Sequence, residues 1–419
     1  MAAPHLQRSQ PEISRADDCW APQARLAFED TAAALDLEPA IVERFRHPVE
    51  ESTAYLQLMR DSGDAVSIPL FQVRHTAMWG ETIGSLSILA DLQRQDCEAI
   101  AMERSWQAAL LGLPWGGASY GLVCDPDEMS ERELVQVLRR AARVLARSRI
   151  EGSLIMPGHS CRREFMAKLF AVLRGRRHVK VCGKPDCLRG LDLDRFAAEG
   201  TTAIIARTLS QAGKSGDTAK VAVQGFGPLG QAVCRCLADA GFSVIAVSDT
   251  SAGIYRSDGL LLDDVRAHVA REELLLGYAQ AERISRGDLL HVKADVLVLT
   301  QGPNELQTTG LGVDAPSVFV EADWNAVTPL AKEQLASRSV FVPWVLAACG
   351  TLCGAYIEGG NLHGLSTEEE LLLRTRRACE QATSRALAYA DANDCSFSQA
   401  VYCQAIERAA SSARLVDQD

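Results

Sequence analysis

The sequence predicts an α/β protein built on a doubly wound parallel sheet. From Ala203 to about Pro343, five apolar runs alternate with helical patterns, at 221–224, 244–248, 294–299, 318–321 and 340–342. Such alternation is typical of parallel strands joined by crossover helices. A glycine-rich turn follows the first of these runs, as in a dinucleotide-binding unit. The chain is 419 residues long, which favours two domains because a single core seldom grows beyond about 250–300 residues.

The glycine turn has the complete sequence context of a Rossmann unit. An apolar strand leads into Gly225-x-Gly227-x-x-Gly230, a helical pattern follows, and the next apolar run ends in Asp249. The first glycine permits the tight turn, the second lets a pyrophosphate approach, and the third lets the helix pack against the strand. The candidate cofactor-binding residues are Gly225, Phe226, Gly227, Leu229, Gly230, Asp249 and Thr250. The alternative is a Rossmann unit that keeps its glycines for packing and has lost its ligand.

Asp249 favours NAD over NADP as the ligand of this unit. It lies 19 residues after Gly230 and closes the second strand. A carboxylate at this place can bind both ribose hydroxyls and would repel a 2′-phosphate.

Composition excludes several classes of function. The net charge is −11, and the Lys and Arg residues are scattered, which argues against a nucleic-acid partner. No apolar run approaches the length of about 20 residues that spans a bilayer, and the polar N-terminus is no signal peptide. The 13 cysteines have no disulfide or zinc spacing, so we expect reduced thiols, a cytoplasmic location and no metal site.

Outside the Rossmann segment, the sequence predicts both helices and strands. We expect helices over 26–46 and 93–111, strands over 66–73 and 121–125, and a linker through 182–185. Ser130-x-x-Glu133 and Ser366-x-x-Glu369 have the spacing of capping boxes. They predict a helix after each serine, the second running to about residue 390 and followed by a last helix over 398–415.

These segments, in this order, resemble the glutamate/leucine/phenylalanine/valine dehydrogenase family, and most closely glutamate dehydrogenase. The matching segments are VAVQGFGPLGQAV, IAVSDTSAGIYRSDG, Gly-Leu-Pro-Trp-Gly-Gly at 112–117, Val-Cys-Asp-Pro at 123–126 and Gly-Lys-Pro at 183–185. The resemblance implies a flexible tail over 1–25, an N-terminal substrate and oligomerisation domain over 26–195, a Rossmann domain over 196–345, and C-terminal helices over 346–419 that return to the first domain. It also implies an NAD(P)-dependent oxidative deamination of an amino acid.

The charged groups that this chemistry needs in the family are replaced. Ser119 stands at the place of the catalytic lysine of the glycine loop, and Gly158 at the place of the aspartate that moves protons. The lysines that hold substrate carboxylates and a pocket serine are also absent. The five degenerate positions are Ile83, Gln107, Ser119, Gly158 and Ala355. The resemblance therefore implies a pseudoenzyme that has lost amino-acid dehydrogenation.

The nicotinamide half of the cofactor site departs from the family in the same way. Two family asparagines align with Trp324 and Ala348, and a Thr-Gly-Arg motif remains only as Ala-Glu-Gly-Thr at 198–201. The retained glycines and Asp249 face the adenosine half. We expect weak or vestigial binding of NAD or an adenine nucleotide, without hydride transfer.

Other residues of the pocket segments could have replaced the lost groups. His159 and Cys161 flank Gly158, and His75 and Tyr120 lie in neighbouring pocket segments. A Cys-His pair can act as a nucleophile, but the sequence shows no acid that would orient the histidine. Lys184 of the Gly-Lys-Pro segment is structural in the family.

The sequence thus favours a regulatory or structural homologue that acts as a homo-oligomer, a hexamer by resemblance, or as a hetero-oligomer with an active paralogue. One alternative is a working NAD-dependent oxidoreductase on an altered amino-acid-like substrate. The other is an interaction protein that binds no nucleotide.

Overall fold

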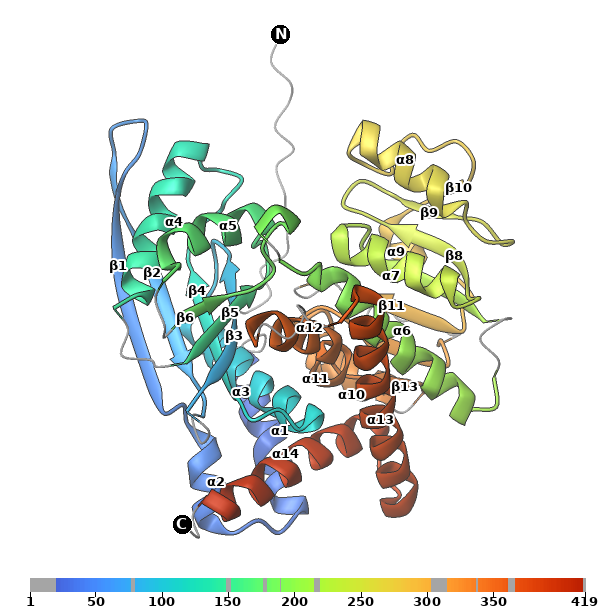
Figure 1. Ribbon diagram of the computed structural model, residues 1–419. Coiled ribbons are helices and arrows are strands. Elements are labelled where there is room, and N and C mark those ends of the chain that lie inside the picture. The colour runs from blue at the N-terminus through green and yellow to red at the C-terminus, as the bar shows by residue number, and fades with distance from the viewer. Residues whose placement is uncertain are drawn as a thin grey trace.

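The computed structural model describes residues 20–76, 80–147, 152–175, 179–188, 190–214, 219–302, 315–336, 338–360 and 366–416. Two sheets lie on opposite sides of the molecule, and helices from distant parts of the chain lie between them (Figure 1). This is the mixed α/β architecture with a parallel Rossmann-type sheet that the sequence predicts.

The first sheet has the strand order β1-β2-β4-β3-β5-β6. Its strands are β1 (Glu50–Met59), β2 (Ala65–Arg74), β3 (Thr82–Ile88), β4 (Gly116–Leu122), β5 (Ser153–Pro157) and β6 (Val179–Val181). The β1–β2 and β2–β4 pairs are antiparallel, and the remaining pairs are parallel. The short strand expected over 121–125 instead begins at Gly116, so Ser119 lies in the middle of a strand and not in a loop.

Helices cover both faces of this sheet. They are α1 (Trp20–Ala34), α2 (Pro39–Arg46), α3 (Arg94–Leu111), α4 (Glu131–Leu145) and α5 (Arg163–Leu173). The single helix expected over 26–46 is wrong, because Asp36 adopts a left-handed conformation (φ 48°) between α1 and α2. The expected tail over 1–25 is too long, since α1 already begins at Trp20 and buries Phe28. Residues 1–19 lie outside the described residues.

The first capping box is confirmed. The Ser130 side chain accepts a hydrogen bond from the Glu133 amide, and the Glu133 carboxylate accepts one from the Ser130 amide. Helix α4 then buries one apolar face against the first sheet, because its apolar side chains recur with the helical period. The buried side chains include Leu134, Val137, Leu138, Ala141 and Leu145.

The second sheet has the strand order β10-β9-β8-β7-β11-β12-β13. Its strands are β7 (Lys220–Gln224), β8 (Ser243–Ser248), β9 (Gly253–Tyr255), β10 (Glu282–Ile284), β11 (Val296–Leu299), β12 (Val318–Glu321) and β13 (Val340–Val342). All five apolar runs are confirmed as strands, and they pair in parallel. Helices α7 (Pro228–Asp239), α8 (Leu262–Glu272), α9 (Arg286–Leu289) and α10 (Pro329–Ala336) accompany this sheet.

The remaining helices join the two sheets into one molecule. They are α6 (Leu193–Gln211), α11 (Trp344–Ala347), α12 (Cys349–Gly359), α13 (Glu368–Asn393) and α14 (Phe397–Val416). Helix α13 packs on α6, and α14 packs on α1 and α3, so the C-terminal helices return to the N-terminal part of the chain. One apolar cluster runs from Phe28 and Trp106 through these helices to Val221 of the second sheet. Hereafter, the N-terminal unit means α1–β6 and the Rossmann unit means β7–β13.

Two boundaries differ from the sequence expectation. The second capping box is formed one residue later than expected, by Thr367 and Glu370, and α13 begins at Glu368. The division expected at 195/196 falls inside α6, because this helix continues without a break from Leu193 to Gln211.

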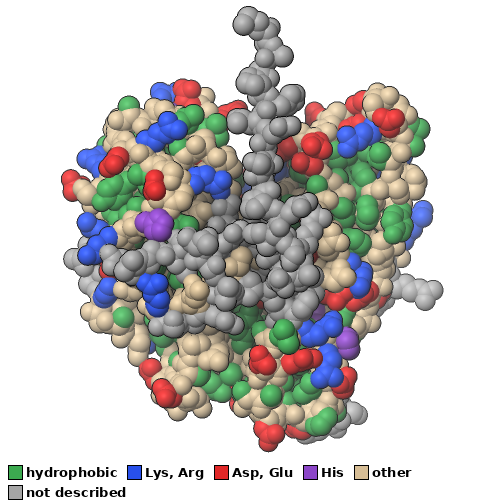
Figure 2. Space-filling view, turned by 180° about the vertical axis from the view of Figure 1, so that it is seen from behind, with side chains coloured by type: hydrophobic (Ala, Val, Ile, Leu, Met, Phe, Trp, Pro, Cys, Tyr) green, Lys and Arg blue, Asp and Glu red, His purple; other side chains and the backbone are tan. Residues whose placement is uncertain are grey.

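No helix of the described residues is both long enough and apolar enough to span a membrane. On the face shown in Figure 2, acidic and basic side chains of the described residues are interspersed, with no stripe of one sign.

Candidate functional site

Two of the five degenerate positions now belong to one apolar cluster. Ile83 of β3 and Ala355 of α12 are both fully buried, and they pack in a cluster with Leu154 and Met156 of β5 and with Trp115. Where the resemblance expects a lysine and a serine beside a substrate, this chain has aliphatic contacts between the first sheet and α12. Placing a charge there would require burial without a charged partner, which costs several kcal/mol.

Ser119 is enclosed by helix α3. Alternate residues of a strand face the same side, so Ser119 shares a face with Gly117 and Gly121. A Cβ atom on Gly117 would lie 2.0 Å from the Ala101 carbonyl oxygen, and one on Gly121 would lie 2.6 Å from Cys97 Sγ. Helix α3 therefore rests directly on this face of β4. Ser119 is fully buried beneath it and leaves no room for a lysine.

Gly158 lies against the end of strand β3. A Cβ atom on this residue would lie 2.6 Å from Ser87 Oγ and 2.9 Å from the Leu86 carbonyl oxygen. The Gly158 amide also donates a hydrogen bond to that carbonyl, at 2.9 Å. Any larger residue here requires a shift of β3 or of the turn, so an aspartate cannot be restored by substitution alone.

Gln107 takes part in a polar contact between α3 and the segment after β13. Its Oε1 accepts a hydrogen bond from Arg104 Nη1 at 2.5 Å, and its Nε2 donates to the Trp344 carbonyl at 3.4 Å. The Arg104 guanidinium lies 4.5 Å from the centre of the Trp344 ring, a cation–π contact. The residue at the position of a substrate-binding lysine thus serves the packing of α3 on α11.

Sequence reasoning missed a group of buried charges around Gln107. Glu103 and Arg104 lie on α3, and Glu321 lies on β12 with Lys332 at 3.0 Å from its Oε2. Burial raises the pKa of Glu103 to about 7, with Lys332 opposing and Glu321 adding to the effect. Burial also lowers the pKa of Arg104 to about 10. Glu103 and Arg104 are adjacent in the chain, and both are inside because nearly every residue of α3 from Cys97 to Leu110 is buried. The signal in the sequence was a pair of charged residues within this mostly apolar segment.

Two of the four possible replacements are structural residues. His75 is buried with both ring nitrogens bonded, Nδ1 to Ser105 Oγ and Nε2 to the Phe45 carbonyl, each at 2.8 Å. Burial lowers the pKa of His75 to about 4, so it stays neutral. Tyr120 faces the opposite side of β4 from Ser119 and packs among aliphatic side chains under α4 and α5.

The Cys161–His159 pair is not an activated nucleophile. Cys161 is buried, its Sγ contacts Met166 Sδ at 3.5 Å, and burial raises the pKa of the thiol to about 12. A protonated thiol of this kind is unreactive near neutral pH. His159 is different, because its Nδ1 lies 3.5 Å from Asp323 Oδ2 of the Rossmann unit. Sequence reasoning missed this acid, because the two residues are far apart in the chain.

The glycine turn has the conformation and the open space that its sequence spacing predicts. Gly225 has φ +99°, which only glycine adopts readily, and a Cβ on Gly230 would lie 2.0 Å from the Gly225 carbonyl oxygen. A Cβ on Gly227 would meet nothing within 4 Å. Gly227 is the N-cap of α7, so open space lies in front of the free amides at the positive end of this helix. Phe226 is buried in the core behind the turn, and Leu229 is half-buried.

The Asp249 carboxylate accepts hydrogen bonds from the loop that follows it and from Leu275. Its Oδ1 accepts hydrogen bonds from the Ser251 amide at 2.7 Å, the Ser251 hydroxyl at 2.6 Å and the Ala252 amide at 3.0 Å. Its Oδ2 accepts one from the Leu275 amide at 2.6 Å. Thr250 is exposed beside it. A pocket of about 430 Å³ opens next to this carboxylate and is lined by residues that include Ala252, Leu275, Tyr278 and Arg283.

The residues at the nicotinamide positions are packed into the core. Trp324 and Ala348 are buried in the main apolar cluster, and the Thr201 hydroxyl contacts the Ala347 carbonyl at 3.5 Å. Asn325 follows Trp324 with φ +59°, a left-handed conformation that asparagine tolerates. Where the resemblance expects a small amide beside the nicotinamide, this chain has a bulky indole packed into the core.

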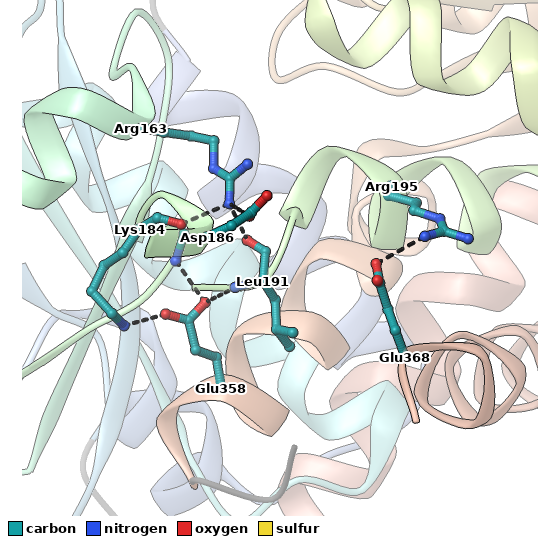
Figure 3. Close-up of polar contacts among 8 residues, drawn as sticks. Arg163, Lys184, Asp186, Leu191, Arg195, Glu358 and Glu368 are labelled. Carbon is teal, nitrogen blue, oxygen red and sulfur yellow. Dashed lines mark hydrogen bonds and ion pairs between the residues drawn. The ribbon is translucent and has the colours of Figure 1, made fainter. Parts of the chain in front are cut away.

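A buried ion pair ties α12 to the 182–191 segment (Figure 3). Lys184 Nζ binds Glu358 Oε1 and donates to the Val181 carbonyl at 2.6 Å. Glu358 Oε2 accepts hydrogen bonds from the amides of Gly183 and Leu191, each at 2.9 Å. The sequence assigned Lys184 a structural role but missed Glu358, which follows Ala355 by one helical turn. Nearby, Arg163 Nη2 donates to the Lys184 carbonyl and to Asp186, each at 2.7 Å.

Across the residues that the structure describes, no group of three or more His, Cys, Asp or Glu side chains could hold a metal ion. The cysteines of the same residues carry free thiols.

Comparison with known proteins matches both sheets to one family. The model of the Glutamate/Leucine/Phenylalanine/Valine dehydrogenases matches residues 191–415, and that of the Glu/Leu/Phe/Val dehydrogenase dimerisation domain matches residues 48–157. Glutamate dehydrogenase A2 of Halobacterium salinarum is 28% identical over 395 residues, which cover 91% of this chain and 94% of that protein. Glutamate dehydrogenase of Thermotoga maritima is 26% identical over 339 residues, covering 79% and 82%.

Solved structures agree on the fold. The hetero-hexameric glutamate dehydrogenase of Thermus thermophilus, in its Leu-bound form, superposes with a TM-score of 0.86 at 22% identity and covers 98% of this chain and 99% of its own. Glutamate dehydrogenase of Peptoniphilus asaccharolyticus superposes with a TM-score of 0.78 at 21% identity, covering 94% and 98%.

Proposed function

This chain belongs to the Glu/Leu/Phe/Val dehydrogenase family, and we propose that it is a regulatory or structural member that has lost amino-acid oxidation. The observation that carries the proposal is the packing of α3 on β4, which encloses Ser119 where the resemblance places the catalytic lysine. Ile83 and Ala355 add to it, because their side chains complete an apolar cluster. A chain that kept the chemistry would need space and charge at these positions.

We further propose that the Rossmann unit binds NAD or an adenine nucleotide weakly. The open space before Gly227 and the pocket beside Asp249 lie in the adenosine half, while Trp324 is packed into the nicotinamide half. The glycine turn would hold phosphates through the amides at the start of α7. Asp249 Oδ2 has one donor within the described residues, so it retains capacity for a ribose hydroxyl, and its charge disfavours NADP. In an active relative, bound NAD would accept the hydride of the substrate.

The glycines of the turn provide a matched pair of test variants. We expect Gly227→Val to weaken nucleotide binding at least about tenfold, because the new side chain would enter the space of the phosphates. The fold should be retained, because a Cβ at this position meets nothing within 4 Å. Gly230→Ala should instead destabilise the unit by about 1–3 kcal/mol, since its Cβ would overlap the Gly225 carbonyl.

Calorimetry with NAD, NADP and ADP, together with thermal unfolding of each variant, measures both effects. Absence of wild-type binding at millimolar nucleotide would mean that the turn serves packing alone. Equal affinity for NAD and NADP would show that Asp249 does not contact the ribose.

We propose a cytoplasmic homo-oligomer, or a mixed oligomer with an active paralogue. β1 is an edge strand of the first sheet, and its outward side chains Tyr55 and Met59 are 66% and 58% exposed. Exposed apolar side chains on an edge strand are a surface that proteins normally cover. The free thiols accord with a reducing compartment.

Light scattering of the purified chain is expected to give a mass of two or more times 45.3 kDa, the mass of one chain. The double variant Tyr55→Glu with Met59→Glu should shift the mass towards the monomer, whereas Leu261→Glu on the Rossmann unit should not. A wild-type monomer at micromolar concentration would contradict the proposal. Co-purification of a dehydrogenase subunit with the tagged chain from its native cell distinguishes the mixed oligomer from the homo-oligomer.

A further inference from the structure

His159 and Asp323 form an ion pair between the two units. Strand β5 of the first sheet ends at Pro157, and β12 of the second sheet ends at Glu321, so each residue lies just beyond the carboxyl end of a parallel strand. His159 Nδ1 lies 3.5 Å from Asp323 Oδ2, and both side chains are about three-quarters buried, with 21% and 26% exposed. At this place a titratable pair therefore joins the N-terminal unit to the Rossmann unit.

The backbone holds His159 rigidly in the N-terminal unit. Its amide donates to Ser87 Oγ at 3.3 Å, and its carbonyl accepts from the Ile88 amide at 3.0 Å. The turn that carries it is clamped by the Gly158 amide on the Leu86 carbonyl, and Ser160 has φ +54°. The His159 backbone is thus fixed to β3. The imidazole separates from Asp323 only if its side chain rotates or if the two units move apart.

Hydrogen bonds within the Rossmann unit position Asp323. Its Oδ1 accepts a hydrogen bond from the Trp324 amide at 2.8 Å, and its Oδ2 accepts one from the Gly302 amide at 3.2 Å. The Asp323 amide contacts the Leu299 carbonyl of β11 at 3.2 Å. The carboxylate is therefore oriented by its own unit before it meets the imidazole.

We propose that this pair is a proton-sensitive latch, in which protonation of His159 sets how tightly the N-terminal and Rossmann units are held together at the carboxyl ends of their sheets. The opposite side of the interface is held by the continuous apolar core through α6, α13 and α14. Opening at the latch therefore leaves the core intact. The proposal does not require that a nucleotide binds.

The electrostatic surroundings favour the charged imidazole. Burial lowers the pKa of His159, but the close contact with the Asp323 carboxylate and the charges of Asp323 and Asp91 outweigh it and raise the pKa above its ordinary value of 6.5. The charge of Asp323 also acts on two further groups, Arg104 of α3 and Asp194 of α6. Burial, with the charge of Asp192 adding to it, raises the pKa of Asp194 to about 6.

The sign of the pH effect follows from linkage. The latched state binds the proton more tightly than the open state, where the histidine titrates near 6.5. The ion pair thus stabilises the contact between the two units fully below pH 6.5. This stabilisation is lost as the pH rises through the higher pKa that His159 has in the latched state. A partly exposed ion pair changes an equilibrium by about two- to fivefold, which is the size of effect to be measured.

The test follows hydrogen exchange and histidine titration of the full chain at pH 6.0 and 8.5. Relative to its intrinsic rate, exchange at the Gly302 and Trp324 amides should be about two- to fivefold faster at pH 8.5 in the wild type. It should be independent of pH in His159→Gln and in Asp323→Asn. His268→Gln, a histidine confined to the Rossmann unit, is the control and should retain the wild-type pH dependence.

NMR of the ring gives a second readout. The His159 resonance should titrate above 6.5 in the wild type and at lower pH in Asp323→Asn, because burial remains while the attraction is lost. An unchanged titration in Asp323→Asn, or an exchange effect of His159→Gln that is equal at both pH values, would overturn the latch.

Discussion

Purified protein is expected to oxidise no common amino acid with NAD or NADP at a detectable rate. General acid–base groups each contribute about 10²–10⁴-fold to such a reaction, and the resemblance places Ser119 and Gly158 at the positions of both. The anchoring positions for substrate carboxylates are Ile83 and Gln107, of which the first is aliphatic and the second is bonded to Arg104 and Trp344. The combined loss places turnover far below the usual range of about 1–10³ per second.

Restoring the lost groups should not restore activity. Ser119→Lys would place an ammonium beneath α3 in a fully buried position, and Gly158→Asp would press a Cβ against Ser87 and the Leu86 carbonyl. Both single variants and their combination should stay inactive and unfold at lower denaturant concentration than the wild type. The assay pairs each protein with an active glutamate dehydrogenase as a positive control. Turnover near one per second with the wild type, or a gain in the double variant, would show that the packed state opens to a catalytic one.

Glu358→Ala is expected to lower the free energy of unfolding by about 3–5 kcal/mol. The substitution would leave the buried Lys184 ammonium without its counter-charge and the Gly183 and Leu191 amides without their acceptor. Because α12 forms one wall of the contact between the first sheet and the C-terminal helices, this loss should loosen the whole junction. Urea unfolding followed by circular dichroism measures the change.

The Arg195–Glu368 ion pair, also drawn in Figure 3, is the matched control for this prediction. Glu368 pairs with Arg195 at 3.0 Å, but both side chains are nearly half exposed, so Glu368→Ala should cost no more than about 1 kcal/mol. The combination Glu358→Leu with Lys184→Met should recover much of the stability lost in Glu358→Ala, since a buried ion pair is often replaceable by apolar groups. Equal costs for Glu358→Ala and Glu368→Ala would mean that solvent reaches the Lys184–Glu358 pair.

Local sequence patterns were sufficient for the Rossmann unit. The five apolar runs became parallel strands, and the glycine turn has the conformations that its spacing predicts, with Gly225 left-handed and Gly230 against the Gly225 carbonyl. These features depend on neighbours in the chain, because a strand, a turn and the next helix are consecutive. Ser130 and Glu133 are a further case, since a capping box closes within four residues. The helix break at Asp36 was missed although Pro39 marks it, since a proline at this place is typical of the first residue of a new helix and Pro39 opens α2.

The state of the candidate site was decided by tertiary structure. From the sequence by itself, the resemblance predicts that Ser119 and Gly158 replace the lysine and the aspartate of the family, because the identity of a residue is read without a fold. Only the fold decided that α3 covers Ser119, that Ala355 meets Ile83, and that Asp323 reaches His159. Each of these contacts joins segments that are distant in the chain. Their formation depends on which surfaces exclude water together, and periodicity along the sequence does not encode that choice.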